Sequence, residues 1–207
     1  MIAWIAASRD GEEVSSPELA ACLDAARGPS GDVGNVMRVH SLRPHTMMGH
    51  QALYMSVLHH DANQLPMWFQ EVIASWVSIL NRCDYSLANH FANARHLIGD
   101  DDRADAVLAA LKAGRPEDAF EAGELAMLRY AGKLTREPGA MVETDVAAMR
   151  AEGVDDGCIL EVNQICGYFN YVNRLLNGLG VTLEGDVVGF YVTPEEAESR
   201  RHAPGGD

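Results

Sequence analysis

Three side chains that can take part in proton or electron-pair chemistry lie close together in the sequence, namely Cys83, Ser86 and His90. They occupy positions i, i+3 and i+7 of a helical pattern, and at ~100° per residue they fall within about 60° of arc. The thiol, the hydroxyl and the imidazole therefore share one face of the helix. Cys83 begins that helix, where the positive end of the helix dipole is expected to lower the pKa of a thiol and favour the nucleophilic thiolate.

A carboxylate lies on the preceding helix. Glu71 belongs to the apolar pattern of residues 67–83, where a buried carboxylate needs a hydrogen-bond partner or a proton. We expect Glu71 to pass protons to His90. Each residue also has a plain structural interpretation: a cysteine that begins a helix is more often a small buried side chain, and Glu71 can point to solvent.

The other histidines and cysteines give weaker signals. His59, His60 and Asp61 offer metal ligands, but adjacent helix residues point in different directions, so no metal site is predicted. The histidines outside the motif are expected to be structural or exposed; they are His40, His45, His50, His59, His60 and His96. The four cysteines have no zinc-binding spacing and are expected to be free thiols. Cys158 or Cys166 could approach Cys83 as a resolving thiol, although a packing role is the favoured interpretation.

The elements that must position these residues are helical. Proline, glycine and capping residues separate a series of helical patterns, and period-two strand patterns are almost absent, so the sequence predicts an all-α fold. The expected helices cover residues 17–27, 35–42, 45–59, 67–83, 84–98, 100–113, 117–136, 143–152 and 155–177. The most apolar of them, residues 67–83, is expected to be central.

The chain is divided into an N-terminal segment with one helix (1–34), a single helical domain (35–183) and a C-terminal tail (184–207). Beyond Val192 the sequence is too polar to offset the entropy of ordering, which predicts a loose end. The net charge of −14 disfavours nucleic acid and anionic membrane surfaces as partners. No segment approaches the ~18 apolar residues of a membrane span, and a cytoplasmic location is expected.

The motif E-x11-C-x-x-[C/S]-x-x-x-H, formed by Glu71, Cys83, Ser86 and His90, resembles the active-site signature of the alkyl hydroperoxidase D and carboxymuconolactone decarboxylase superfamily. Four longer stretches resemble its peroxidase-related branch: residues 35–60, 65–99, 125–141 and 159–181. The resemblance implies an all-helical fold of the alkyl hydroperoxidase D type, no bound cofactor, and homo-oligomers such as trimers or hexamers.

The family's peroxidases carry two cysteines in this motif: the second attacks the peroxide and the first resolves the sulfenic acid into a disulfide. Ser86 stands at the second position here, and a serine hydroxyl can neither reduce a peroxide nor form a disulfide. The two-cysteine cycle therefore cannot run at this site. Glu71 and His90 match the family's proton relay, whereas Tyr85 stands where the peroxidase has a histidine.

The leading hypothesis is a thiol-dependent, hydroperoxide-reducing protein in which Cys83 attacks the distal peroxide oxygen. His90 and Glu71 would protonate the leaving alkoxide, Ser86 would hydrogen-bond the thiolate, and an external thiol would reduce the sulfenate. One alternative is a cofactor-free acid/base enzyme of the carboxymuconolactone decarboxylase type, in which His90 and Glu71 move protons and Cys83 only lines the pocket. Another is a non-enzymatic redox sensor or scaffold. The expected ligand is a small hydroperoxide or another small substrate.

Overall fold

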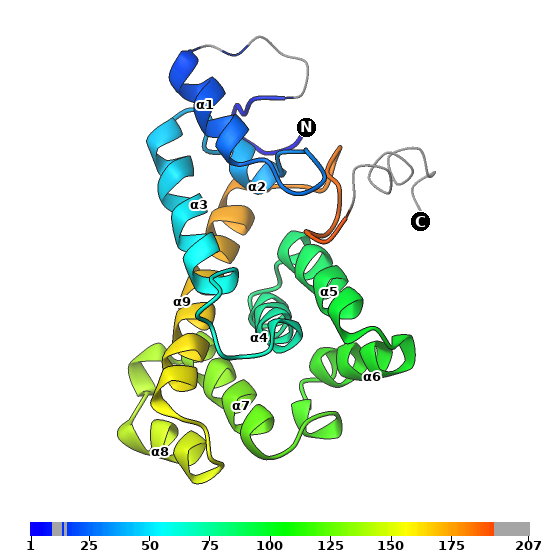
Figure 1. Cartoon of the computed structure of the whole chain (residues 1–207), viewed down its shortest axis with the longest axis vertical. Helices are drawn as coiled ribbons and strands as arrows, with labels where there is room; N and C mark the ends of the chain where they lie inside the picture. Colours follow the sequence, from blue (N-terminus) through cyan, green and yellow to red (C-terminus); the bar gives the residue numbers. More distant parts are fainter. Residues whose placement is uncertain (10–13, 15, 193–207) are drawn as a thin grey trace.

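The computed structural model describes residues 1–9, 14 and 16–192, and within them all regular secondary structure is helical (Figure 1). The helices are α1 (Pro17–Ala25), α2 (Asn35–Arg38), α3 (Pro44–Leu58), α4 (Met67–Leu80), α5 (Asp84–Ile98), α6 (Asp101–Lys112), η1 (Pro116–Asp118), α7 (Ala122–Arg136), η2 (Pro138–Ala140), α8 (Glu143–Ala151) and α9 (Asp156–Leu179). The predicted all-α class is confirmed for these residues. None of their helices is both long and apolar enough to cross a membrane.

Helix α4 forms the centre of the fold, as its apolar pattern predicts. It packs against α5, α7 and α9, and Figure 1 shows it end-on between them. Val72, Ile73 and Val77 are completely buried, and every residue of α4 from Phe69 to Ser78 is buried, so the helix is covered on nearly every side. Trp76 completes the contact with α7 because its indole N–H donates a hydrogen bond of 3.0 Å to the Leu128 carbonyl.

The two largest differences from the predicted helix boundaries are at the start of α7 and the end of α2. The helix expected from residue 117 is a short 3-10 turn followed by α7, which begins only at Ala122. Phe120 lies in the interruption, is 5% exposed, and packs its ring 5.9 Å from that of Phe69. Burial of this ring against α4 outweighs the local helical preference. Helix α2 is also shorter than expected, ending at Arg38.

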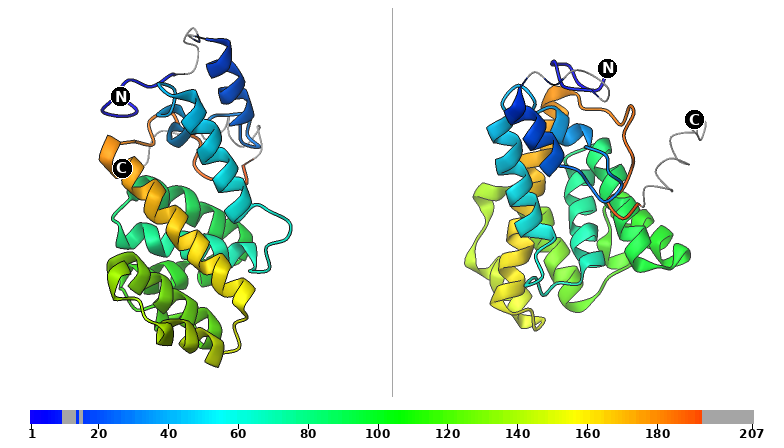
Figure 2. Two further views of the ribbon diagram at one scale, coloured as in Figure 1. Left: turned by 90° about the vertical axis from the view of Figure 1, so that its left-hand side faces the viewer. Right: turned by 45° about the horizontal axis from the view of Figure 1, so that its top comes forward.

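Helices α1 to α3 have a smaller core of their own, made by Leu19, Cys22, Leu23, Val33, Met37 and Met47 with neighbouring residues. This layer lies at one end of α9, with α3 running alongside that helix (Figure 2). Ser16 caps α1 by accepting a hydrogen bond from the Leu19 amide, as the sequence predicts.

After α9 the chain turns back toward α5, and we call residues 184–192 the C-terminal strap (Figure 1). The divisions of the chain at residues 34 and 184 stay predictions, but the strap is held by side chains of α5, as described below. The loose end expected beyond Val192 lies outside the described residues.

Candidate functional site

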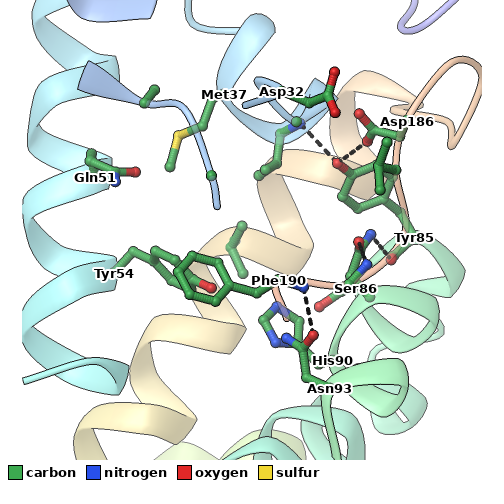
Figure 3. A pocket seen from close by; sticks show the side chains of 18 of the residues that line it. Asp32, Met37, Gln51, Tyr54, Tyr85, Ser86, His90, Asn93, Asp186 and Phe190 are labelled. Atoms are coloured by element: carbon green, nitrogen blue, oxygen red, sulfur yellow. Dashed lines mark hydrogen bonds between the residues drawn. The ribbon is translucent and has the colours of Figure 1, made fainter. Parts of the chain in front are cut away.

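A cavity of about 140 Å³ opens between α3, α5, α9 and the strap (Figure 3). Helix α5 contributes five polar side chains to its wall: Tyr85, Ser86, Asn89, His90 and Asn93. The facing helices α3 and α9 contribute His50, Gln51, Tyr54, Tyr168, Val172 and Leu176, while α2 and the strap add Met37, Asp186 and Phe190. The loop between α1 and α2 adds Arg27, Ser30 and Asp32, among others. The cavity thus has a polar wall on α5 and a lining of both polar and apolar side chains elsewhere.

His90 and Glu71 form a hydrogen-bonded pair at this wall, which is the contact expected from the sequence. The ring Nδ1–H of His90 donates to Glu71 Oε2 over 2.6 Å, and the Glu71 carboxylate is completely buried in α4. A carboxylate bound to Nδ1 fixes the imidazole tautomer and leaves Nε2 as a base. Among the described residues nothing hydrogen-bonds to His90 Nε2, and His90 lines the cavity. The pair can therefore take up and return a proton there.

Asn93 supplies the second hydrogen bond that the buried carboxylate needs. Its Nδ2 donates to Glu71 Oε1 over 3.1 Å, and its Oδ1 accepts from the Phe190 amide over 2.6 Å. The asparagine therefore connects the strap to the proton-transfer pair (Figure 3). Asn93 was not predicted from the sequence, although its position three residues after His90 places it on the same face of the helix.

Cys83 is the N-cap residue of α5, is 2% exposed, and is not among the described residues that line the cavity. Burial raises the pKa of its thiol; the hydrogen bond from the Ser86 amide acts in the opposite direction, and Asp84 adds to the increase. The expectation of a lowered pKa is therefore wrong, because the free-energy cost of desolvating a thiolate exceeds the stabilisation of the thiolate by the helix terminus.

Ser86 is buried but does line the cavity. Its hydroxyl lies 2.8 Å from Ser78 Oγ, and Ser78 in turn donates to the Ala74 carbonyl over 2.7 Å. The single hydroxyl proton of Ser78 is thus within reach of two acceptors, the Ser86 hydroxyl oxygen and the Ala74 carbonyl oxygen. The Ser86 group that interacts with the Cys83 thiol is the backbone amide, and not the hydroxyl that was expected from the sequence.

The four cysteines are free thiols, as expected. Cys166 is completely buried, 3.3 Å from Thr135 Oγ1, and burial raises the pKa of its thiol. Cys158 is partly buried at the start of α9, and burial together with Asp155 raises its pKa to about 11. These environments support the packing interpretation of both residues.

A chain of hydrogen bonds runs behind the α3 and α9 side of the cavity. His40 Nε2 lies 3.0 Å from His50 Nδ1, and His50 Nε2 lies 2.8 Å from the Tyr168 hydroxyl. Burial and the neighbouring His40 lower the pKa of His50 to about 4, so this imidazole is neutral at physiological pH. Both histidines are structural, in line with the sequence prediction, but His50 also lines the cavity.

Tyr54 extends from α3 into the cavity and is partly buried. Its ring packs against the rings of His59, Tyr168 and Phe190, with centroids 4.8, 5.9 and 6.3 Å away. Burial, with a smaller effect of Glu71, raises the pKa of Tyr54 well above its ordinary value. Tyr54 was not predicted as a site residue, because only the packing of α3 on α9 brings its side chain to the cavity.

The strap is fastened to the site through Asp186. The Tyr85 hydroxyl donates to Asp186 Oδ2, and the Asn35 amide donates to both carboxylate oxygens over 3.0 and 3.1 Å. Burial raises the pKa of Asp186 to about 6, although the hydrogen bonds from Tyr85 and Asn35 oppose the shift. Tyr85, which replaces the histidine of the peroxidase motif, thus anchors the strap.

A metal centre is not indicated in the part of the chain that the structure describes, where no three His, Cys, Asp or Glu side chains gather suitably. His59, His60 and Asp61 do not form such a group either. The Nε2 atom of His59 is buried and has no hydrogen-bond partner in the same residues, while its ring stacks on Phe190 with a centroid distance of 4.4 Å.

Comparison with known proteins gives matches at the level of structure. No protein-family profile matches the chain, and no curated protein is similar to it in sequence. A peroxidase-related protein from Silicibacter sp. TM1040 is 25% identical, with a TM-score of 0.69 over 85% of this chain and 91% of that one.

Two structures of lower sequence identity share the fold. A peroxidase-related protein from Ralstonia eutropha JMP134, described as an alkylhydroperoxidase AhpD core, is 21% identical, with a TM-score of 0.74 over 88% of this chain and 92% of that one. The debrominase Bmp8 is 14% identical, with a TM-score of 0.68 over 88% of this chain and 91% of that one. Proteins of this fold therefore include both peroxidase-related proteins and a debrominase.

Proposed function

Because this chain has the fold of the alkyl hydroperoxidase D and carboxymuconolactone decarboxylase superfamily, we propose that it is a cofactor-free acid/base enzyme acting on a small substrate in the cavity beside His90. The observation that carries this proposal is the Glu71–His90 pair, whose free ring nitrogen belongs to a residue of the cavity wall. Glu71 is the positioning residue, and His90 is the catalytic base and acid.

The reaction proceeds by transfer of one proton. His90 Nε2 removes a proton from a substrate carbon next to a carbonyl group, and the electron pair of the broken C–H bond moves onto the carbonyl oxygen. The buried Glu71 carboxylate stabilises the imidazolium that forms. His90 then returns the proton to the same carbon or to a conjugated one, which gives exchange or isomerisation without net oxidation.

A one-cysteine peroxidase is the second candidate. It is supported by the position of Cys83 at the start of α5, by the Ser86 amide beside its sulfur, and by the peroxidase-related structural neighbours. The Cys83 thiolate would form an S–O bond to the distal oxygen as the O–O bond breaks, and His90 would protonate the alkoxide. An external thiol would then reduce the sulfenic acid. The raised pKa and near-complete burial of Cys83 make this the less favoured reaction at neutral pH.

Deuterium incorporation from D₂O into a panel of small ketones, β-keto acids and γ-lactones, followed by NMR, tests the first proposal. The parent and Cys83→Ala are expected to catalyse exchange equally, and His90→Gln to lose about 10²- to 10⁴-fold in rate. His45→Gln, which alters an exposed histidine of α3, is the matched control. No exchange by the parent, together with hydroperoxide reduction that Cys83→Ala abolishes, would replace the first proposal by the second.

A readout that needs no substrate is the tautomer of His90. In the parent the neutral ring is expected to carry its proton on Nδ1, because Glu71 accepts there. In Glu71→Gln the side-chain amide can donate to Nδ1 instead, which moves the proton to Nε2 and removes the base from the cavity. Nitrogen-15 chemical shifts of the ring distinguish the two forms. The same tautomer in both proteins would contradict the role given to Glu71.

We also propose the trimer or hexamer that the sequence resemblance implies. It is supported by exposed apolar side chains on two helices that pack together, Met48, Leu53 and Met55 on α3 and Leu160 and Tyr171 on α9. The cytoplasmic location and the external thiol reductant stay predictions of the sequence.

A further inference from the structure

We propose that Tyr54 is the hydrogen-bond donor to the substrate oxygen on which negative charge develops, so that the substrates are small enolisable carbonyl compounds with an apolar body. This inference rests on the proposed acid/base function, and it adds a second catalytic residue and a substrate class to it.

The first observation is the position of Tyr54 opposite the base. Tyr54 belongs to α3 and His90 to α5, and both line the same cavity of about 140 Å³. Figure 3 shows the Tyr54 side chain extending from α3 toward the α5 wall that carries His90. A molecule that fills this cavity contacts both residues. One end of it then meets the imidazole and another the phenol.

The second observation is the state of the hydroxyl groups around the cavity. The Tyr85 hydroxyl is bonded to Asp186 and the Tyr168 hydroxyl to His50. No described residue forms a hydrogen bond with the Tyr54 hydroxyl. The hydroxyl oxygen is accessible to solvent and is not among the buried atoms that lack a partner. A polar group in such a partly apolar site is stable only with a partner, and the cavity contents are what can provide one.

The third observation is that the ring of Tyr54 is held in place. The rings of His59, Tyr168 and Phe190 pack against it, so the hydroxyl has little freedom to turn away. A donor fixed before the reaction stabilises developing charge more effectively than a mobile one, because it does not have to reorganise. The raised pKa of Tyr54 keeps its proton in place at neutral pH, which suits a donor and not a base.

The other polar side chains of α5 that line the cavity have hydrogen-bond partners within the protein. Asn89 donates to the Tyr85 carbonyl and accepts from the Gly189 amide, and the Ser86 hydroxyl lies 2.8 Å from Ser78 Oγ. Both ring nitrogens of His50 are hydrogen-bonded. Gln51 is the remaining neutral candidate on α3, so it serves as the comparison in the experiment.

The proposed reaction is a proton transfer from substrate carbon to His90, assisted by one hydrogen bond from Tyr54. The C–H bond breaks, its proton goes to His90 Nε2, and the electron pair becomes the charge of an enolate oxygen that accepts the Tyr54 O–H. Tyr54 keeps its proton throughout, and His90 returns the transferred one. The apolar body of the substrate packs against side chains such as Met37, Val172 and Phe190.

Binding of 4-nitrophenolate, an aromatic mimic of an enolate, tests the assignment without any turnover. Its Kd at pH 8 is compared with that of nitrobenzene, which has a similar ring and no phenolate oxygen. Tyr54→Phe is expected to weaken binding of the phenolate about 10- to 100-fold, as for a hydrogen bond to a charged group. Nitrobenzene binding is expected to stay within about twofold. His45→Gln, at an exposed site of α3, is the matched control and is expected to leave both values unchanged. Gln51→Leu tests the competing donor.

Every other pattern overturns the inference. Unchanged phenolate binding in Tyr54→Phe excludes the donor role, equal losses for both probes indicate ring packing alone, and a loss confined to Gln51→Leu moves the donor to Gln51. Binding of neither probe by the parent excludes the substrate class. Deuterium exchange separates this failure from that of the proposed function: exchange that needs His90 but not Tyr54 contradicts only the inference, whereas exchange independent of His90 contradicts the function itself.

Discussion

Cys83 and His90 lie on one helix seven residues apart, yet their side chains have different surroundings. The imidazole reaches the cavity wall, and its Nδ1 is bonded to a buried carboxylate. The thiol lies at the helix terminus with 2% of its surface exposed. Chemical reactivity at the scale of the residue therefore follows access and hydrogen bonding more closely than residue type.

The reactivity of Cys83 is the first prediction. Its thiol is expected to react with iodoacetamide at pH 7 at least about tenfold more slowly than glutathione, because burial both shields it and raises its pKa. The rate is expected to increase as the pH rises above 9, since the thiolate fraction grows. Peptide mass spectrometry after timed labelling identifies the site. Labelling of Cys83 at pH 7 as fast as glutathione would restore the peroxidase hypothesis.

At the scale of the elements, the strap connects parts of the chain that are distant in sequence. Asp186 binds Tyr85 on α5 and the first amide of α2, while Asn89 and Asn93 bind the backbone at Gly189 and Phe190. The strap thus closes one side of the cavity and orients the asparagine that holds Glu71.

The pH dependence of this attachment is the second prediction. The folded-state pKa of Asp186, about 6, exceeds the value near 4 of an unfolded aspartate, so the folded state binds more protons between these values. The Asp186 contribution to stability is therefore complete below about pH 4 and is lost as the pH rises through 6. Relative to Asp186→Asn, the parent is expected to lose on the order of 2 kcal/mol of unfolding free energy between pH 4 and 7. Urea unfolding of both proteins measures this, and a pH-independent difference would contradict it.

The end of α9 gives the third prediction. Gly180 has a φ of +59°, and a Cβ there would lie 2.1 Å from the Trp4 ring, so Gly180→Ala is expected to destabilise the protein by about 1 to 2 kcal/mol or more. Gly178 lies in the helix with open space around it. Gly178→Ala is the matched control and is expected to stabilise by about 0.5 to 1 kcal/mol. Thermal and urea unfolding compare the two, and equal effects would contradict both the left-handed conformation of Gly180 and its close contact with Trp4.

At the scale of the whole molecule, apolar side chains remain exposed on α3 and on α9. A helical protein with exposed apolar side chains of this kind tends to cover them with another copy. Because α3 also carries Tyr54, the proposed assembly would hold the α3 side of the cavity in place as well.

The fourth prediction concerns this assembly. Light scattering of the purified protein is expected to give three or six times the 22.5 kDa mass of one chain. Leu53→Glu is expected to reduce the mass, because it puts a charge on the exposed face of α3, whereas Val142→Glu, at an exposed site before α8, is expected to leave it unchanged. A monomer for the parent would exclude the proposed oligomer.

The sequence by itself determined the helices, most of their ends and the pairing of Glu71 with His90. These features depend on residues near one another in the chain: Ser16 caps α1, Gly99 and Gly180 end α5 and α9 in left-handed conformations, and helical spacing fixes which side chains share a face of α5. The apolar pattern of α4 likewise required a central position, which in turn buried Glu71.

Only the tertiary structure decided which motif residues reach the cavity and what faces them. Helical periodicity groups Cys83, Ser86 and His90 but does not state how deeply each is covered, because coverage depends on helices distant in sequence. Tyr54 and the strap reach the site through contacts between residues that lie more than a hundred positions apart in the sequence, for instance Asn35 and Asp186. Such contacts arise from the burial of apolar surface by the whole chain, which no local pattern specifies.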